Sequence, residues 1–195
     1  MLFRDPPDHT RLRALVNRAF TPRVIENLRS RIQQIVEQLL DRAQDAGAMD
    51  VIADLAYPLP VTVICDMLGV PPGDRDRIRQ WSADVARSLD AIGLPADPEI
   101  VERGRSARHA LGDYFRSLIP ERRKRPQADL LSLLIAAEER GDRLSEGELL
   151  AMCILLFIAG HETTVNLIGN GMLALLRHPE QLTRLRSEPA LIQRA

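Results

Sequence analysis

The feature that most constrains this fold is a long apolar segment over residues 146–177. Ser145 and Glu148 form a capping box at its start, a pattern in which two side chains satisfy free backbone N–H groups at the start of a helix. The sequence that follows, LLAMCILLFIAG, is apolar on nearly every side of a helical wheel. Because such a helix is stable in water only when other elements cover it, we expect it to be the buried core of a helical domain.

The composition also favours a mainly α fold. Of the 195 residues, 45% are apolar but only 4% are aromatic. Strands favour aromatic and β-branched residues, whereas Leu and Ala serve helix packing. A chain of this length can bury one sizeable core, so we expect a single domain over residues 1–195.

Apolar residues recur at intervals of three and four in further segments, which predicts more helices. These are 8–20 with Asp8 as its cap, 22–46 ending at Gly47, a segment ending at Leu68, one around Trp81, 98–125 with a kink at Pro120, one capped by Asp129, and short helices opening at Pro179 and Pro189. Three other segments are expected to be an extended piece near residue 50, a mobile loop over 91–98, and a solvated helix end, ERRKR, over 121–125.

Charge and cysteine content disfavour several classes of protein. Lys and Arg total 26 against 27 Asp and Glu, so the whole chain lacks the positive excess typical of proteins that bind nucleic acid or membrane surfaces. Cys65 and Cys153 lie in apolar stretches without a metal-ligand spacing, which indicates buried thiols. The longest apolar run, residues 149–160, is shorter than the roughly 20 residues of a membrane span. With no signal peptide at its start, the chain is expected to be cytoplasmic, away from membranes and nucleic acid.

A polar quartet, residues 161–164, interrupts the apolar helix in the sequence AGHETT. Ala159 and Thr163 are four residues apart, as are Gly160 and Thr164, so two small residues share helix faces with two hydroxyls. Glycine in a helix costs about 1 kcal/mol relative to alanine, which indicates that this segment gives up stability for another purpose. The pattern predicts a shallow notch in which a flat ligand could lie.

Two interpretations of the quartet stay open on helix physics alone. In one, the Thr163 hydroxyl bonds to the carbonyl one turn earlier and opens the helix, while Glu162 passes protons. In the other, Thr163 and Thr164 merely satisfy the backbone and Glu162 pairs with a neighbouring arginine. A zinc peptidase helix is excluded because the position four residues after His161 is Val165.

The segment DPPDHTRLR carries a second constellation. A helical wheel places His9 and Arg13 on one side together with Leu12 and Val16, and turns Arg11 away. Two inward cations require an anion, and a planar guanidinium beside an imidazole suits carboxylates. The alternative is that Arg13 extends to solvent and His9 pairs with a local aspartate.

Together DPPDHTRLR, the later AGHETT and the intervening PLPVTVICDMLGVP resemble the bacterial, soluble cytochrome P450 family. The resemblance runs from Phe3 to the end of the chain. It implies the central helical part of that fold and a monooxygenase that uses haem b to insert one atom of dioxygen into a small hydrophobic organic substrate. Electrons would come from NAD(P)H through a ferredoxin and ferredoxin reductase type of partner.

The resemblance also assigns roles to residues. His9 and Arg13 match the residues that bind the haem propionates, and Ala159 and Gly160 match those that form the notch over the porphyrin and the oxygen pocket.

Thr163 matches the family's catalytic alcohol, which helps to deliver protons to dioxygen, and Glu162 matches its acidic neighbour. The loop over 91–98 resembles the substrate-access lid.

The sequence departs from the family pattern at the metal ligand. Neither the Gly-rich loop with the iron-binding cysteine nor the preceding E-x-x-R helix is present, and Cys65 and Cys153 match neither in context nor in order. The N-terminal helices and the main sheet are also missing, so we expect a domain truncated at both ends. Because the thiolate favours O–O cleavage, this chain alone is expected to be inactive and to bind haem weakly if at all.

Two other classes of function remain as alternatives. One is a non-catalytic helical ligand-binding or regulator domain that contacts DNA through its arginine-rich start. The pair Pro6-Pro7 and the absence of a second recognition-helix pattern disfavour a helix-turn-helix domain that binds DNA. The other is a pseudogene remnant without a biochemical role.

Overall fold

The computed structural model describes residues 4–90, 97–139 and 144–194. Every regular element in these ranges is helical, which confirms the mainly α prediction. The α-helices are α1 (Asp8–Ala19), α2 (Pro22–Ala46), α3 (Pro58–Leu68), α4 (Arg75–Asp90), α5 (Pro98–Lys124), α6 (Leu130–Glu139), α7 (Glu146–Arg177) and α8 (Pro179–Ser187). A π-helical turn, Val51–Ala56, precedes α3, and 3-10 turns cover Pro72–Asp74 and Pro189–Arg194.

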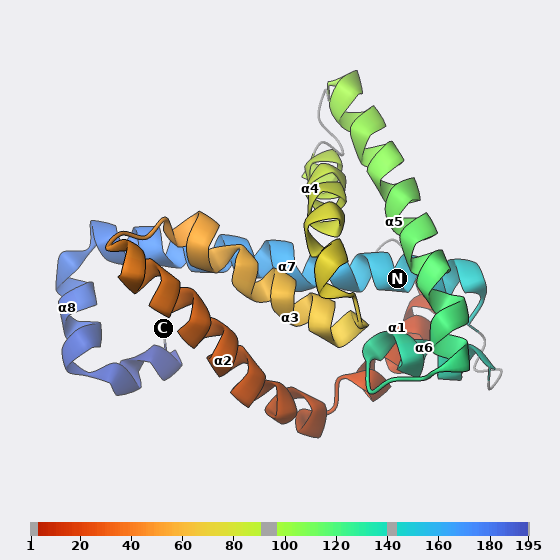
Figure 1. Ribbon diagram of the computed structural model, residues 1–195, viewed down its shortest axis with the longest axis horizontal. Helices are drawn as coiled ribbons and strands as arrows, with labels where there is room; N and C mark the ends of the chain where they lie inside the picture. Colours follow the sequence, from red (N-terminus) through yellow and green to blue (C-terminus); the bar gives the residue numbers. More distant parts are fainter. Residues whose placement is uncertain (1–3, 91–96, 140–143, 195) are drawn as a thin grey trace.

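Helix α7 is the element on which the others assemble. It runs along the long axis of the molecule, with α3 packed beside it and the α4–α5 hairpin rising from it (Figure 1). Its inner side is a stripe at intervals of four residues, and Leu149, Cys153, Phe157 and His161 on this stripe are fully buried. The predicted core helix is therefore confirmed for its inner side.

The same helix is not covered all round, contrary to our expectation. Leu167 and Leu176, in its second half, are 72% and 62% exposed. By length and mean hydropathy α7 and the segment Val51–Leu68 are both apolar enough to cross a membrane, although neither has an uninterrupted apolar run of that length. The core helix of a soluble domain meets the same criterion, and α7 holds that central position here.

Three predicted helix ends are confirmed. Gly47 ends α2 in the left-handed conformation, with φ of 69°. The Asp129 carboxylate accepts a hydrogen bond of 2.7 Å from the backbone N–H of Ser132 at the start of α6. At the start of α7, Ser145 and Glu148 form both hydrogen bonds of the capping box.

Other boundaries differ from the prediction. Pro7 occupies the cap position of α1, and Asp8 is the first helical residue. The piece expected to be extended is instead the π-helical turn Val51–Ala56, because the Asp50 side chain accepts hydrogen bonds from two N–H groups of that turn. Helix α5, by contrast, covers nearly the predicted range and contains Pro120, and the kink expected there stays a prediction. The expected loop at 91–98 lies for the most part outside the described residues, and α5 already begins at its last residue.

The segment 121–125 is not simply a solvated helix end. Arg122 is buried and donates to the Asp129 carboxylate at 2.8 Å and to the Gly69 carbonyl at 2.6 Å. Gly69 has φ of 69°, and a Cβ built there would lie 2.1 Å from an Asp129 oxygen. The arginine therefore joins the end of α5, the cap of α6 and the turn after α3.

Candidate functional site

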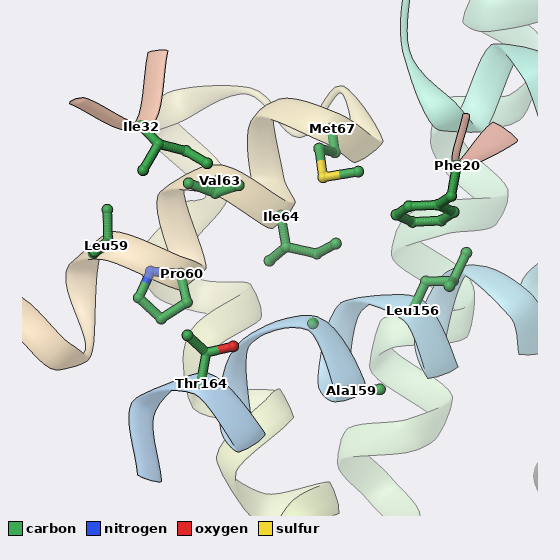
Figure 2. Close-up of a pocket in the computed structure, with 11 residues that line it drawn as sticks. Phe20, Ile32, Leu59, Pro60, Val63, Ile64, Met67, Leu156, Ala159 and Thr164 are labelled. Atoms are coloured by element: carbon green, nitrogen blue, oxygen red, sulfur yellow. The ribbon is translucent and has the colours of Figure 1, made fainter. Parts of the chain in front are cut away.

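An apolar pocket of about 420 Å³ lies between α7, α3 and α2 (Figure 2). Helix α7 contributes Ala159, Gly160 and Thr164, and the end of α1 contributes Phe20. Thr164 is the only polar side chain among the lining residues. The structure thus brings the AGHETT turn and the end of the DPPDHTRLR helix to one apolar pocket.

Helix α3 approaches α7 closely at Gly160. A Cβ built on Gly160 would lie 2.9 Å from Cδ1 of Ile64, which points from α3 toward α7 in Figure 2. Gly169, one of the other glycines of α7, meets the Ile52 side chain in the same way, at 2.6 Å. Close helix packing therefore explains these glycines, and Ile64 fills part of the predicted notch.

Thr163 lies on an exposed face of α7, outside the pocket lining. Its hydroxyl donates a hydrogen bond of 2.8 Å to the carbonyl of Ala159, one turn earlier. The hydrogen bond of the first interpretation is therefore present, but α7 stays α-helical throughout this turn and does not open. Ala159 is also exposed. A small residue and the Thr163 hydroxyl therefore share one accessible surface of α7.

Glu162 pairs with a histidine rather than with an arginine. Its Oε1 lies 3.3 Å from Nε2 of His161, and its side chain is 26% exposed. The arginine partner of the second interpretation is not found among the residues that the structure describes. His161 itself is fully buried and also contacts the Ser82 hydroxyl, 3.0 Å from Nε2, and the Phe157 carbonyl, 2.7 Å from Nδ1.

The cations of α1 are arranged differently from the helical-wheel prediction. Arg13 is exposed and His9 is half-buried, whereas Leu12 forms part of the packed face. Arg11, expected to point away, instead forms hydrogen bonds with both carboxylate oxygens of Glu148 at the start of α7. Across the described ranges, neither His9 nor Arg13 has an acidic group within ion-pair distance.

Burial and ion pairing set the charge state of three groups near α7. The Arg11 guanidinium, aided by the Ser145 N–H, lowers the pKa of Glu148 to about 2. Burial raises the pKa of Cys65 and that of Cys153 to about 12, so both stay neutral thiols. Both cysteines are free and buried, as predicted.

Comparison with known proteins decides the family. The family model for cytochrome P450 matches residues 1–194. The chain belongs to the cytochrome P450 family. The resemblance of DPPDHTRLR and AGHETT to this family is therefore confirmed.

Individual cytochrome P450 proteins match over the whole chain. Cytochrome P450 CYP107DY1 of Priestia megaterium is 47% identical, and the match covers 100% of this chain and 46% of that protein. Vitamin D(3) 25-hydroxylase of Pseudonocardia autotrophica is also 47% identical, with 100% and 46% covered. The chain thus spans a little under half the length of these cytochrome P450 relatives.

Solved cytochrome P450 structures show the same helical arrangement. The crystal structure of P450BioI in complex with a hexadec-9Z-enoic acid ligated acyl carrier protein superposes with a TM-score of 0.89 at 43% identity. That match covers 98% of this chain and 48% of the P450BioI chain. The fold is therefore the helical part of the cytochrome P450 fold, incomplete relative to its relatives.

Proposed function

We propose that the intact protein is a haem-dependent monooxygenase and that α7 of this chain carries its proton-delivering residues. One observation carries the proposal. A single turn of α7 combines an accessible small residue, Ala159, with an accessible hydroxyl, Thr163, beside an apolar pocket and next to a half-buried carboxyl group, Glu162.

The residues present fit haem b. A flat apolar ring requires a wall without bulky side chains. We assign this wall to Ala159 and Gly160 on α7, although Ile64 covers Gly160 in part. The two haem propionates require cations that no protein acid already neutralises. His9 and Arg13 meet this requirement within the described part of the chain, where no acidic group pairs with them, and we assign them to the propionates.

The protein residues would manage protons, whereas bound haem supplies the activation of dioxygen with two electrons. One oxygen atom enters the substrate and the other leaves as water, which consumes two protons. Glu162, partly open to solvent, can take up a proton, and the adjacent Thr163 hydroxyl can accept and donate one at Oγ1. We propose both as catalytic residues.

Substrate and partners follow from the same family. We propose a small hydrophobic organic substrate, in keeping with the apolar pocket and with a relative named for hydroxylation of vitamin D(3). We further propose that NAD(P)H supplies electrons through a ferredoxin-type partner. The protein would act in the cytoplasm, without membrane or nucleic acid, and residues 1–195 would be part of one domain.

The test compares the intact protein with the 195-residue chain. We expect the intact protein to bind haem, to give a thiolate-type Soret band in its ferrous carbonyl form, and to form product with NAD(P)H and a ferredoxin system. The 195-residue chain, whose cysteines are buried in apolar surroundings, should show neither the band nor turnover. An intact protein without haem, or a 195-residue chain with turnover, would refute the proposal.

A further inference from the structure

The buried histidine of the AGHETT turn has no task in the function proposed so far. His161 is 0% exposed on α7, and Ser82 of α4, its partner at 3.0 Å, is also fully buried. The ring of Phe157 lies 4.9 Å away and that of Tyr57 6.4 Å away, centroid to centroid. A polar ring in such surroundings is costly unless each nitrogen is satisfied, so its hydrogen bonds fix its orientation.

The identity of the partners determines where the ring protons lie. The Phe157 carbonyl can only accept, so Nδ1 of His161 carries a hydrogen and donates it at 2.7 Å. Nε2 then faces two oxygens, the Ser82 hydroxyl at 3.0 Å and the Glu162 carboxyl at 3.3 Å. A bare Nε2 facing a bare carboxylate would bring two lone pairs together.

Two arrangements avoid that repulsion. Either Nε2 is protonated, with Ser82 accepting its hydrogen bond and an ionised Glu162 within ion-pair distance, or Nε2 is unprotonated and accepts from the Ser82 hydroxyl while Glu162 carries the proton. In both arrangements the two neighbouring groups hold one proton together, either on Nε2 of His161 or on the Glu162 carboxyl group. Two further charged groups act on Tyr57, namely Asp76 and Arg79 of α4, and the Arg79 guanidinium lies 5.1 Å from the Tyr57 ring centre.

We propose that His161, oriented by Ser82 and the Phe157 carbonyl, is a positioning residue that fixes the Glu162 carboxyl group and keeps a proton next to Thr163. This inference rests on the proposed function. It adds that α4, which contributes Ser82, controls the proton-delivering group of α7 through a buried contact between residues 79 positions apart.

The chemistry gives the inference a specific signature. When protons reach dioxygen at the right moment, two electrons and two protons yield hydroxylated product and water. When delivery is mistimed, the same two electrons and two protons leave with dioxygen as hydrogen peroxide. Loss of a positioning residue should therefore redirect electrons to peroxide without stopping their consumption.

The test uses the intact protein with three variants. We expect His161→Leu to lower product per NAD(P)H about 10-fold while peroxide rises and haem content stays unchanged, because small misplacements of catalytic groups are costly. His161→Gln, which keeps a polar group near the Nε2 position, should recover part of the loss. The matched control is His178→Gln, an exposed histidine 3.5 Å from Glu180, which should change nothing.

A second readout does not depend on turnover. In the diamagnetic ferrous carbonyl form, ¹⁵N NMR of labelled histidines should show a protonated Nδ1 at His161. Glu162→Gln and Ser82→Ala should each shift the His161 Nε2 signal, and both should leave His178 unaffected. A His161 signal insensitive to both variants would overturn the inference.

The outcomes separate the two proposals. A wild type that makes no product would defeat the proposed function, and the NMR comparison, run on whatever form is obtained, would still decide the His161–Glu162 contact. If His161→Leu forms as much product per NAD(P)H as the wild type, the positioning role is overturned. So would a loss of product matched by equal loss of haem and of NAD(P)H consumption, because that pattern marks a purely structural residue.

Discussion

The two halves of α7 meet very different surroundings. In the first half Cys153 and Phe157 are fully buried, whereas in the second half Leu167 and Leu176 are largely exposed. The proposed catalytic residues, Glu162 and Thr163, lie at the border between the halves. The difference shows that one long and largely apolar helix has a half that other helices cover and a half that stays open, with the proposed site between them.

The largest expected effect tests the packed half. Phe157→Ala should lower the free energy of unfolding by about 3–5 kcal/mol, because a fully buried aromatic ring leaves a cavity. Leu167→Ala, in the open half, should cost less than about 0.5 kcal/mol. Urea unfolding of the 195-residue chain measures both, and equal losses would show that the two halves are equally buried.

A second test addresses the border itself. Gly160→Val should lower stability by about 1–3 kcal/mol, because its side chain must displace Ile64 of α3. The companion variant Ile64→Ala should partly restore Gly160→Val by making room. If the double variant loses as much stability as the two single variants together, the close approach of α3 does not cause the loss in Gly160→Val.

The start of the packed half should respond to pH. Arg11 holds the pKa of Glu148 near 2, below its ordinary value of 4.5, so the pair stabilises the fold fully above about pH 4.5 and is lost as pH falls toward 2. Glu148→Gln should remove about 1 kcal/mol at neutral pH, given the partial exposure of the pair. It should also flatten the acid limb of the stability profile, and an unchanged limb would contradict the assignment.

The smallest effect belongs to the open half. Among the described residues, a Cβ built on Gly171 meets nothing within 4 Å apart from its chain neighbours and the backbone of its own helix, so alanine fits there. Gly171→Ala should raise stability by about 0.5 kcal/mol through better helix propensity. A loss of stability in thermal unfolding would mean that the open half is packed against something.

Local sequence determined much of this protein. The capping box of Ser145 and Glu148, the glycine end of α2 and the Asp129 cap arise from interactions within five residues, which a linear pattern displays. The motifs DPPDHTRLR and AGHETT were enough to identify the family. They also place the proposed site on one turn of α7, which stays a prediction.

Tertiary structure alone decided which polar groups meet. The helical wheel predicted that Arg11 points outward and Arg13 inward. In the structure Arg11 instead binds Glu148 at the start of α7, 137 positions away in the sequence. In the same way, the sequence pattern predicted that Arg122 faces solvent and did not single out Ser82. In the structure each of them binds a buried partner. Helical periodicity shows which side of a helix is apolar, whereas a buried hydrogen bond depends on which distant helix packs against that side.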